Sequence, residues 1–250
     1  MTFRLESLAA RFSPIDLAGI EDLAPMEQRF DRKYVVSSEE AKSFFARVPE
    51  DLLALEIGER RSFSYQSWYF DTEDLESFRG TAHQRRRRWK VRTRTYLDDA
   101  TSMVEVKLRY QRGQSFKHRR PEDSPSDMCL TTQGAGFVND VLRKDGFAET
   151  LVPTLRTSYE RISLVDAETR VRLTADLNVR CRTVDGKEVS VNGVVIETKS
   201  PNSPGHIDRA LWRHGHRPVR LSKYATGMAA THSELPRNKW HQTIRRHISD

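Results

Sequence analysis

Apolar and charged residues alternate along several segments of the sequence. In residues 86–94 every even position is Arg or Lys, whereas the odd positions include Trp89 and Val91. Segments 103–109 and 171–180 alternate in the same way. Because successive side chains of a β-strand point to opposite faces, each segment is predicted to be a strand with one apolar and one charged face. The charged faces carry Arg86, Arg88, Lys90, Arg92 and Arg94; Glu105, Lys107 and Arg109; and Arg172, Thr174, Asp176, Asn178 and Arg180.

Turn and capping residues divide the chain into further elements. Ser37 followed by two glutamates predicts a helix start, and Gly80 predicts a helix end. The segment 121–136 is rich in Pro, Ser and Gly and is predicted to be a loop. Strands are expected at 26–37, 63–72, 84–96, 101–110, 112–120, 154–166, 169–182 and 193–200, and helices within 3–23, at 38–47, 73–79, 137–146 and 207–214, and within 217–232.

No internal repeat, low-complexity linker or change of composition divides the sequence, so a single domain is predicted over residues 1–250. Its core is expected at about 25–230, with a helical segment at 1–24 and a loosely held basic tail at 235–250. The expected fold class is α+β. Its antiparallel strands would close into a β-barrel tunnel with a charged lumen, and helices would pack on the apolar outside.

The charge of the chain points to an anionic partner. A formal net charge of +7 and an isoelectric point of about 9.5 suit nucleic acid, an anionic membrane surface or a phosphorylated molecule. An idle, solvated sheet face is the alternative. However, like charges roughly 7 Å apart along a strand repel by about 2 kcal/mol at an effective dielectric constant near 20. Rows of arginine are favourable when an anion lies among them, so the charged faces are interpreted as a polyanion site.

Targeting signals are lacking in the sequence. No apolar run reaches the length of a membrane span, and the N-terminal residues mix acids with short apolar stretches, unlike a signal peptide. Cys129 and Cys181 lie far apart and are predicted to be free thiols in a reduced, cytoplasmic protein. No P-loop motif occurs, which excludes nucleotide binding of that type.

Four carboxylates also lie on the charged faces: Asp31, Glu105, Asp176 and Glu197. Acids repel phosphate and are unfavourable on a nucleic-acid surface. Carboxylate oxygens are ligands of Mg²⁺ and Mn²⁺, which bridge phosphate oxygens. Each acid could equally pair with a neighbouring arginine. Four acids on separate strands favour at least one metal site.

The order of the motifs resembles a known family. "FDRKYVV", "YFDT", "KVRTRTY", "VEVK", "SYERISL", "RLTADLNV", "VVIETKS" and "LSKYATG" occur in the order seen in the catalytic domain of the vacuolar transporter chaperone (VTC) family, over about residues 25–230. That domain is a polyphosphate polymerase of the triphosphate tunnel metalloenzyme superfamily. The resemblance implies a barrel tunnel, ATP and polyphosphate as ligands, Mn²⁺ or Mg²⁺ as cofactor, and transfer of the ATP γ-phosphate onto a polyphosphate chain.

The resemblance also implies roles for individual residues. Lysines and arginines of the matched motifs would grip phosphates, and Glu197 in "IETK" would bind the metal, with Asp176 and Glu105 as further candidates. Lys117 is a looser match, and Lys90 and Lys199 come from the charged faces. The expected catalytic residues are Arg92, Arg94, Lys107 and Arg161, and the expected phosphate-binding residues are Lys33, Lys90, Lys117, Tyr159, Lys199, Ser222 and Lys223.

The sequence departs from the superfamily at its first motif. Where other members have E-x-E-x-K, this chain has Arg29, Asp31 and Lys33, which is closer to the polymerase branch than to the triphosphate hydrolases. No residue decides whether a chain end or water attacks the phosphate. An inorganic or nucleoside triphosphatase therefore stays open as an alternative. So does a non-catalytic module for polyphosphate or RNA, although no sequence-specific nucleic-acid binding is expected.

Overall fold

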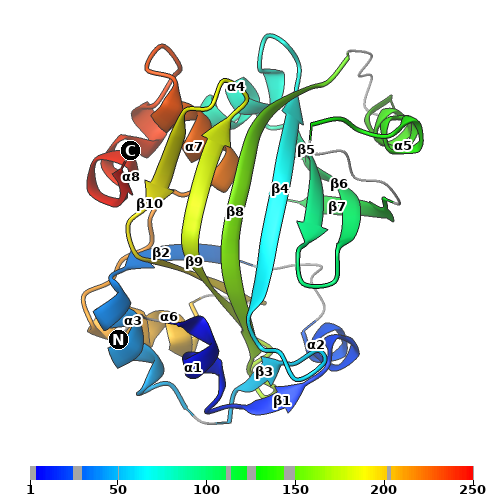
Figure 1. Ribbon diagram of the computed structural model, residues 1–250. Helices are drawn as coiled ribbons and strands as arrows, with labels where there is room; N and C mark the ends of the chain where they lie inside the picture. Colours follow the sequence, from blue (N-terminus) through cyan, green and yellow to red (C-terminus); the bar gives the residue numbers. More distant parts are fainter. Residues whose placement is uncertain are drawn as a thin grey trace.

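A large, curved and mostly antiparallel sheet forms the centre of the molecule (Figure 1). The structure is a computed structural model that describes residues 4–24, 30–49, 51–110, 114–122, 128–143, 150–201 and 204–249. The strands are β1 (Ser13–Ile15), β2 (Phe30–Val36), β3 (Leu53–Leu55), β4 (Phe63–Asp71), β5 (Arg88–Tyr96), β6 (Thr101–Arg109), β7 (Ser115–Pro121), β8 (Val152–Val165), β9 (Arg172–Thr183), β10 (Glu188–Val191), β11 (Val194–Ser200) and β12 (Ile248–Ser249).

The sheet has two arms that meet at the long strands β8 and β9. One arm continues from β8 through β4, β5 and β6 to β7, and the other runs from the first half of β9 through β11 to β2. The second half of β9 pairs instead with β10, which pairs with β12. The short strand β3 pairs with β8 and, in parallel, with β1.

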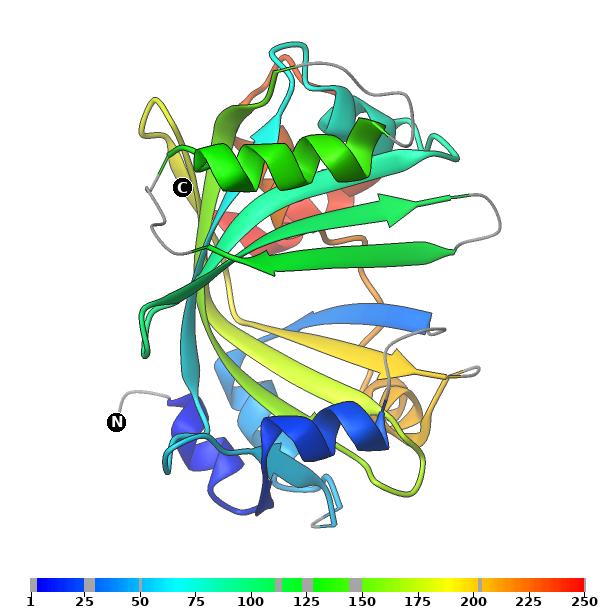
Figure 2. The ribbon, with the colours of Figure 1, turned by 90° about the vertical axis from the view of Figure 1, so that its right-hand side faces the viewer.

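The predicted closed barrel is not confirmed. Among the described residues β7 and β2 form no pair with each other, so each ends its arm of the sheet. Figure 2 shows the two arms standing apart, with β5–β7 above and β2, β9 and β11 below. The architecture is mixed α and β with a large, curved antiparallel sheet that stays open along one side.

Helices cover the apolar face of each arm. Against the β2–β11–β9 arm pack α1, α3 and α6, where Phe44 and Leu211 share a core with Tyr34 and Ile196. Against β5 and β6 packs α5, through Val138 and Leu142. Apolar alternation of the strands therefore predicts correctly the faces that α1, α3, α5 and α6 cover. The helices are α1 (Leu5–Ala9), α2 (Leu17–Leu23), α3 (Ser38–Phe45), α4 (Glu76–Ala82), α5 (Thr132–Arg143), α6 (His206–Arg213), α7 (Lys223–Thr231), α8 (His241–His247) and the 3₁₀ helix η2 (Asn238–Trp240).

Three helices pack on the other, concave face at one end of the sheet. Residues of α4, α7 and η2 form a core with Tyr69, Leu155 and Cys181. Tyr69 and Leu155 lie on the same strand faces as Tyr65 and Tyr159, because strand side chains alternate. Figure 1 shows α4, α7 and α8 together at the end of the sheet opposite α1 and α3. These helices therefore close one end of the concave face.

A β-bulge reverses the predicted alternation of β9. The register with β8 shifts between Ser158 and Glu160, and Asn178 has a positive φ of 55°. Beyond the bulge Val179 and Cys181 are buried, whereas Arg180 is exposed and pairs with Glu188. The prediction that Asn178 and Arg180 share a charged face with Asp176 is therefore wrong, since one extra residue moves the later side chains to the other face.

The basic tail was predicted to be loosely held, and this prediction is wrong. Residues 238–247 form η2 and α8, and β12 pairs with β10. Trp240 is 2% exposed and packs against Phe78 with ring centroids 5.9 Å apart. Apolar residues between the basic ones anchor this segment to the rest of the molecule.

The start of one helix differs from the prediction. Helix α5 (132–143) begins five residues before the predicted start at 137. The predicted positions 144–146, like residues 26–29 of the first predicted strand, lie outside the described residues. Both cysteines are free, as predicted. Within the described part of the chain, no helix combines the length and apolarity that crossing a bilayer requires.

Candidate anion-binding site

The concave face of the sheet gathers cations from both arms, and we call this group the concave site. Strands β5, β6 and β7 contribute from one arm and β2 and β11 from the other, with β8, β9 and the start of α7 between them. Its members are Lys33, Lys90, Arg92, Arg94, Lys107, Lys117, Arg161 and Lys223, with Glu105, Asp176, Glu197 and Tyr159.

Strand register places several cations side by side in β5, β6 and β7. Lys107 lies between Lys90 and Lys117, and Glu105 lies between Arg92 and Arg119. Like charges directly opposite each other on neighbouring strands are destabilising. The row of three lysines is therefore an unfavourable arrangement that an anion on this face would relieve.

Glu105 is the acid that organises the arginines of β5. Its carboxylate lies 2.5 Å from Arg92 Nη2, 2.5 Å from Lys117 Nζ and 4.0 Å from Arg94 Nε. Burial raises the pKa of Glu105, but Arg92, Arg94 and Lys117 outweigh it and hold the pKa well below its usual value. The carboxylate therefore stays charged and fixes these cations on the concave face.

Asp176 has the same role in the centre of the sheet. Arg161 donates to both of its oxygens, from Nε at 2.5 Å and Nη2 at 2.8 Å, and Lys223 Nζ also contacts the carboxylate. Burial raises the pKa of Asp176, whereas Arg161 and Lys223 lower it to about 2. A bidentate pair holds the guanidinium in one orientation. Arg161 and Lys223 are thus positioned from β8 and α7 by one acid of β9.

Two stacked tyrosines lie beneath the arginines. The rings of Tyr65 and Tyr159 stack with centroids 5.3 Å apart, and Arg94 lies 5.4 Å and Arg161 5.7 Å from the Tyr65 ring centroid. Burial raises the pKa of Tyr159, but Arg94, Arg161 and Lys223 lower it to about 8. A positive potential that lowers the pKa of a buried phenol also favours the binding of other anionic groups on this face.

The segment before α7 joins the two arms. Lys33 Nζ of β2 donates to Leu221 O at 3.3 Å, and Lys90 Nζ of β5 donates to Ser222 Oγ at 2.9 Å. Burial holds the pKa of Lys90 well below its usual value, and the charges of Lys33, Lys107, Arg88 and Arg92 lower it further. The cations of both arms therefore act on one another as a single electrostatic group.

Some buried polar atoms in this region have no hydrogen-bond partner among the described residues: Ser67 Oγ, Thr157 Oγ1, Thr174 Oγ1 and Arg94 Nε. Ser67 lies between Arg94 and Thr157 in the strand register, on the face that carries Tyr65. A buried polar group without a partner costs about 1–3 kcal/mol. A ligand or ordered water on the concave face would satisfy such atoms.

The three predicted metal ligands do not come together as one site. Within the described segments, no group of three or more His, Cys, Asp and Glu side chains could hold a metal ion. Glu105 and Asp176 are occupied by cations, whereas the ion pair of Glu197 with Lys199 is long, at 3.9 Å. Burial raises the pKa of Glu197, but Lys199 and Lys33 outweigh it and keep the group charged. Mg²⁺ at phosphate sites takes one or two carboxylates with substrate oxygens, which Glu197 fits.

The sequence therefore predicts which charged residues share the concave face, and their role in binding stays a prediction. Lys199 follows Glu197 by two positions on the same face of β11, and Lys107 lies in register with Lys90. Sequence reasoning missed Tyr65, Ser67 and Thr157, whose strands were predicted without assigning their uncharged residues to the site. The sequence could have identified Ser67, because strand alternation places it on the same face of its strand as Tyr65.

Comparison with solved structures shows the fold class. A candidate adenylate cyclase from Bacillus halodurans matches with a TM-score of 0.50 and 17% identity, covering 78% of this chain and 94% of its own. The Hippeastrum protein HpAC1, described as a candidate adenylyl cyclase with a dominant triphosphatase activity, matches with a TM-score of 0.46 and 14% identity, covering 85% and 100%. At these identities the first match shows a shared fold and nothing more.

The sequence profile of the VTC domain matches residues 28–232, which is most of the chain. The protein belongs to the VTC domain family, as the order of its motifs predicts. A search of curated protein sequences finds no significant match.

Proposed function

We propose that this protein is a polyphosphate polymerase that transfers the γ-phosphate of ATP onto a polyphosphate chain bound on the concave face. Membership of the VTC domain family supports an enzyme acting on triphosphates. The observation that carries the proposal is the convergence of cations from both arms of the sheet, with the segment before α7 joining Lys33 to Lys90. ATP and a polyphosphate chain, bound in line on the concave face, would neutralise the positive charge of these cations.

Phosphoryl transfer depends mainly on positioning and charge neutralisation by the protein. In the proposed complex Arg92, Arg94 and Arg161 bind the triphosphate, since Glu105 and Asp176 already hold them in place. Preorganised cations stabilise the charge of the transition state without moving when it forms. Lys33, Lys90 and Lys107 would bind the acceptor chain, whose terminal oxygen attacks the γ-phosphate and releases ADP.

A divalent ion, Mn²⁺ or Mg²⁺, fits beside Glu197 and would supply charge neutralisation at the phosphate oxygens. Lys117, Tyr159, Lys199, Ser222 and Lys223 are proposed to complete the phosphate-binding residues, while Asp176 and Glu105 position their cations. We also propose that a bound chain draws the open arms together into a tunnel. The phosphates of the chain would lie between the cations of the two arms and offset their repulsion.

Purified protein incubated with ATP and Mn²⁺ tests the polymerase, with the products separated by gel electrophoresis. Long-chain polyphosphate and ADP are expected. Arg94→Ala and Glu197→Gln should each lower the rate by about 10²-fold or more, because Arg94 would bind the transferred phosphate and Glu197 would hold the divalent ion beside it. Arg143→Ala, an exposed arginine of α5, is the control and should keep the wild-type rate.

Release of orthophosphate without polymer would replace this proposal with a triphosphatase. Tight metal-independent binding of RNA without turnover would replace it with a polyanion-binding module. Wild-type activity in Arg94→Ala would place the reaction elsewhere in the molecule.

A further inference from the structure

Four cations, from three separate elements and the segment before α7, lie beyond Lys90 at one end of the concave site. Arg88 begins β5 and lies directly opposite Arg109, the last residue of β6. Arg220 precedes α7, and Lys239 lies in η2, beyond the residues that the family profile matches. We call Arg88, Arg109, Arg220 and Lys239 the end cluster. Because Arg88 precedes Lys90 by two residues, it shares the strand face of the concave site.

The members of the end cluster repel one another. Burial lowers the pKa of Lys239 to about 8, and the charges of Arg88, Arg220 and Arg109 contribute to that shift. The pKa of Arg88 is likewise lowered by burial and by Arg109. None of the four makes an ion pair with a carboxylate in the described part of the chain, in contrast to Arg92, Arg161 and Lys223.

The C-terminal segment fixes Lys239 in this position. Trp240 packs on Phe78 of α4, and Lys239 Nζ donates to Thr81 O at 2.7 Å. An ammonium group has three donors, so one hydrogen bond to a carbonyl leaves donors for a ligand. The side chain of Thr243 in α8 donates to Arg220 O at 3.1 Å, which ties the segment before α7 to the C-terminal segment.

The opposite end of β5 differs in character. There Tyr96 packs against Tyr65, with ring centroids 5.2 Å apart. Met103 of β6 lies in register with Arg94, and Pro121 of β7 lies in register with Met103, so no cation continues the row of Arg94 on these two strands. Among the described residues of β5, β6 and β7, cations without acids therefore extend the concave site at the end of Arg88 and not at the end of Tyr96. Along these three strands, a ligand longer than a triphosphate gains further cationic contacts at the end of Arg88.

From this asymmetry we infer that the end cluster is an outer phosphate subsite, which binds the polyphosphate chain where it leaves the concave site. This inference rests on the proposed function. It also gives the bound polyphosphate chain a direction, from the concave site toward the end cluster. Phosphates near the reacting group contact the concave site, and those several units away contact Lys239 and Arg220.

The test compares a short and a long ligand. Tripolyphosphate fills the concave site alone, whereas long-chain polyphosphate also reaches the end cluster. In Arg220→Ala/Lys239→Ala the affinity for long-chain polyphosphate should fall by about 10-fold or more, because each charge-assisted contact contributes on the order of a factor of ten. The affinity for tripolyphosphate should change by less than about 3-fold, since screened charges at a distance contribute little. Both affinities are measured by isothermal titration calorimetry.

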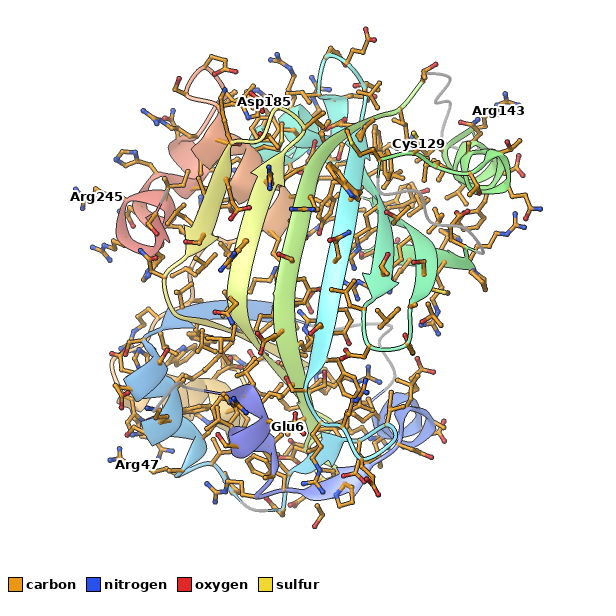
Figure 3. All side chains as sticks on the ribbon, viewed as in Figure 1. Glu6, Arg47, Cys129, Arg143, Asp185 and Arg245 are labelled. Atoms are coloured by element: carbon orange, nitrogen blue, oxygen red, sulfur yellow. The ribbon has the colours of Figure 1, made fainter. Side chains whose placement is uncertain are left out.

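Two further variants separate the subsite from general effects. Arg143→Ala/Arg245→Ala removes the same charge from exposed arginines that point outward from α5 and α8 (Figure 3), and it should keep the affinity for both ligands. Lys239→Gln can still donate to Thr81 O, so a fall in its long-chain affinity reports the lost charge and not a lost structural contact.

An unchanged long-chain affinity in Arg220→Ala/Lys239→Ala, or an equal fall in the outer-surface control, would overturn the subsite while leaving the proposed function intact. If wild-type protein bound neither ligand, the proposed function itself would fail, and the subsite with it.

Discussion

Tyr159 shows at the scale of one residue how strongly the concave site favours negative charge. Its hydroxyl is buried, which by itself disfavours the phenolate, yet the surrounding cations lower its pKa from 10.0 to about 8. Burial and charge act in opposite directions here, and the charge of Arg94, Arg161 and Lys223 prevails. The same positive potential that lowers the pKa of this phenol would attract a phosphate oxygen.

The lowered pKa of Tyr159 predicts a pH dependence of stability. Between about pH 8 and pH 10 the folded protein has released a proton that the unfolded chain still holds, so the free energy of unfolding rises with pH in this window. A shift of this size corresponds to about 2–3 kcal/mol. Urea unfolding of wild type and Tyr159→Phe across this range should show a difference that grows with pH. A difference independent of pH would contradict the lowered pKa.

Lys90 predicts proton uptake on ligand binding. Its pKa lies well below the usual value because the ammonium is buried among other cations. A bound phosphate favours the charged ammonium, so binding should draw a proton from solution. Calorimetric titration with tripolyphosphate in two buffers of different ionisation enthalpy measures this proton.

Lys90→Met should reduce the uptake by up to about one proton. Lys187→Met, at an exposed lysine paired with Asp185, is the control and should leave the uptake unchanged. Identical uptake in Lys90→Met and wild type would show that Lys90 is already charged in the free protein.

At the scale of elements, the position of α7 decides where Ser222 and Lys223 lie. The helix packs closely on β8 and β9 at Gly227, where an added Cβ would lie 2.8 Å from Leu155 Cδ2 and 2.9 Å from Cys181 Cβ. Gly227 thus permits the close approach that brings Lys223 to Asp176 and Ser222 to Lys90.

Gly227→Ala should therefore weaken both the fold and the site. Displacing α7 by a few tenths of an ångström costs about 1–3 kcal/mol of unfolding free energy, as in other overpacked cores. Tripolyphosphate affinity should fall as well, because Ser222 and Lys223 move with the helix. Chemical denaturation and calorimetry measure the two effects.

The matched control for this prediction is Gly136→Ala in α5, where no atom lies within 4 Å of the added Cβ. That change should be neutral or stabilise the protein by up to about 1 kcal/mol, because Ala favours helix more than Gly. Equal stability of Gly227→Ala and wild type would show that α7 does not pack closely on β8 and β9 at this position.

Elements with strong alternation are predictable from this sequence, and elements set by tertiary packing are not. The segments 86–94 and 103–109 carry their own signal in the order of residues, whereas the bulge at Asn178 depends on how β9 meets β8. The short strands β10 and β12 are not predicted from the sequence, because only their pairing in the folded protein defines them. Strand β10 pairs with β9, and β12 pairs with β10. The folded C-terminal segment was missed for a similar reason, since Trp240 finds its partner Phe78 far away in sequence.

At the scale of the whole molecule, the sequence predicts which strand faces meet but not whether the sheet closes. Charged faces on both arms imply a common interior, and ties such as Lys90 to Ser222 show that they share one. Closure depends on whether β7 and β2 reach each other, and neither strand carries a residue pattern that specifies that pairing. Six of the seven residues of β7 are exposed, at the edge of its arm.

An excess of cations across the whole concave site predicts a protein that its ligand stabilises strongly. Without an anion the like charges of both arms repel, and with one they are neutralised. Tripolyphosphate at about 100 times its dissociation constant should raise the free energy of unfolding by about 2.7 kcal/mol. Thermal unfolding should shift upward accordingly, and the shift should shrink as added salt screens the site. Sodium sulfate of matched ionic strength is the control, and Arg94→Ala should lose most of the shift. If sulfate stabilised the protein as much as tripolyphosphate, the cations of the two arms would act as separate weak sites rather than one.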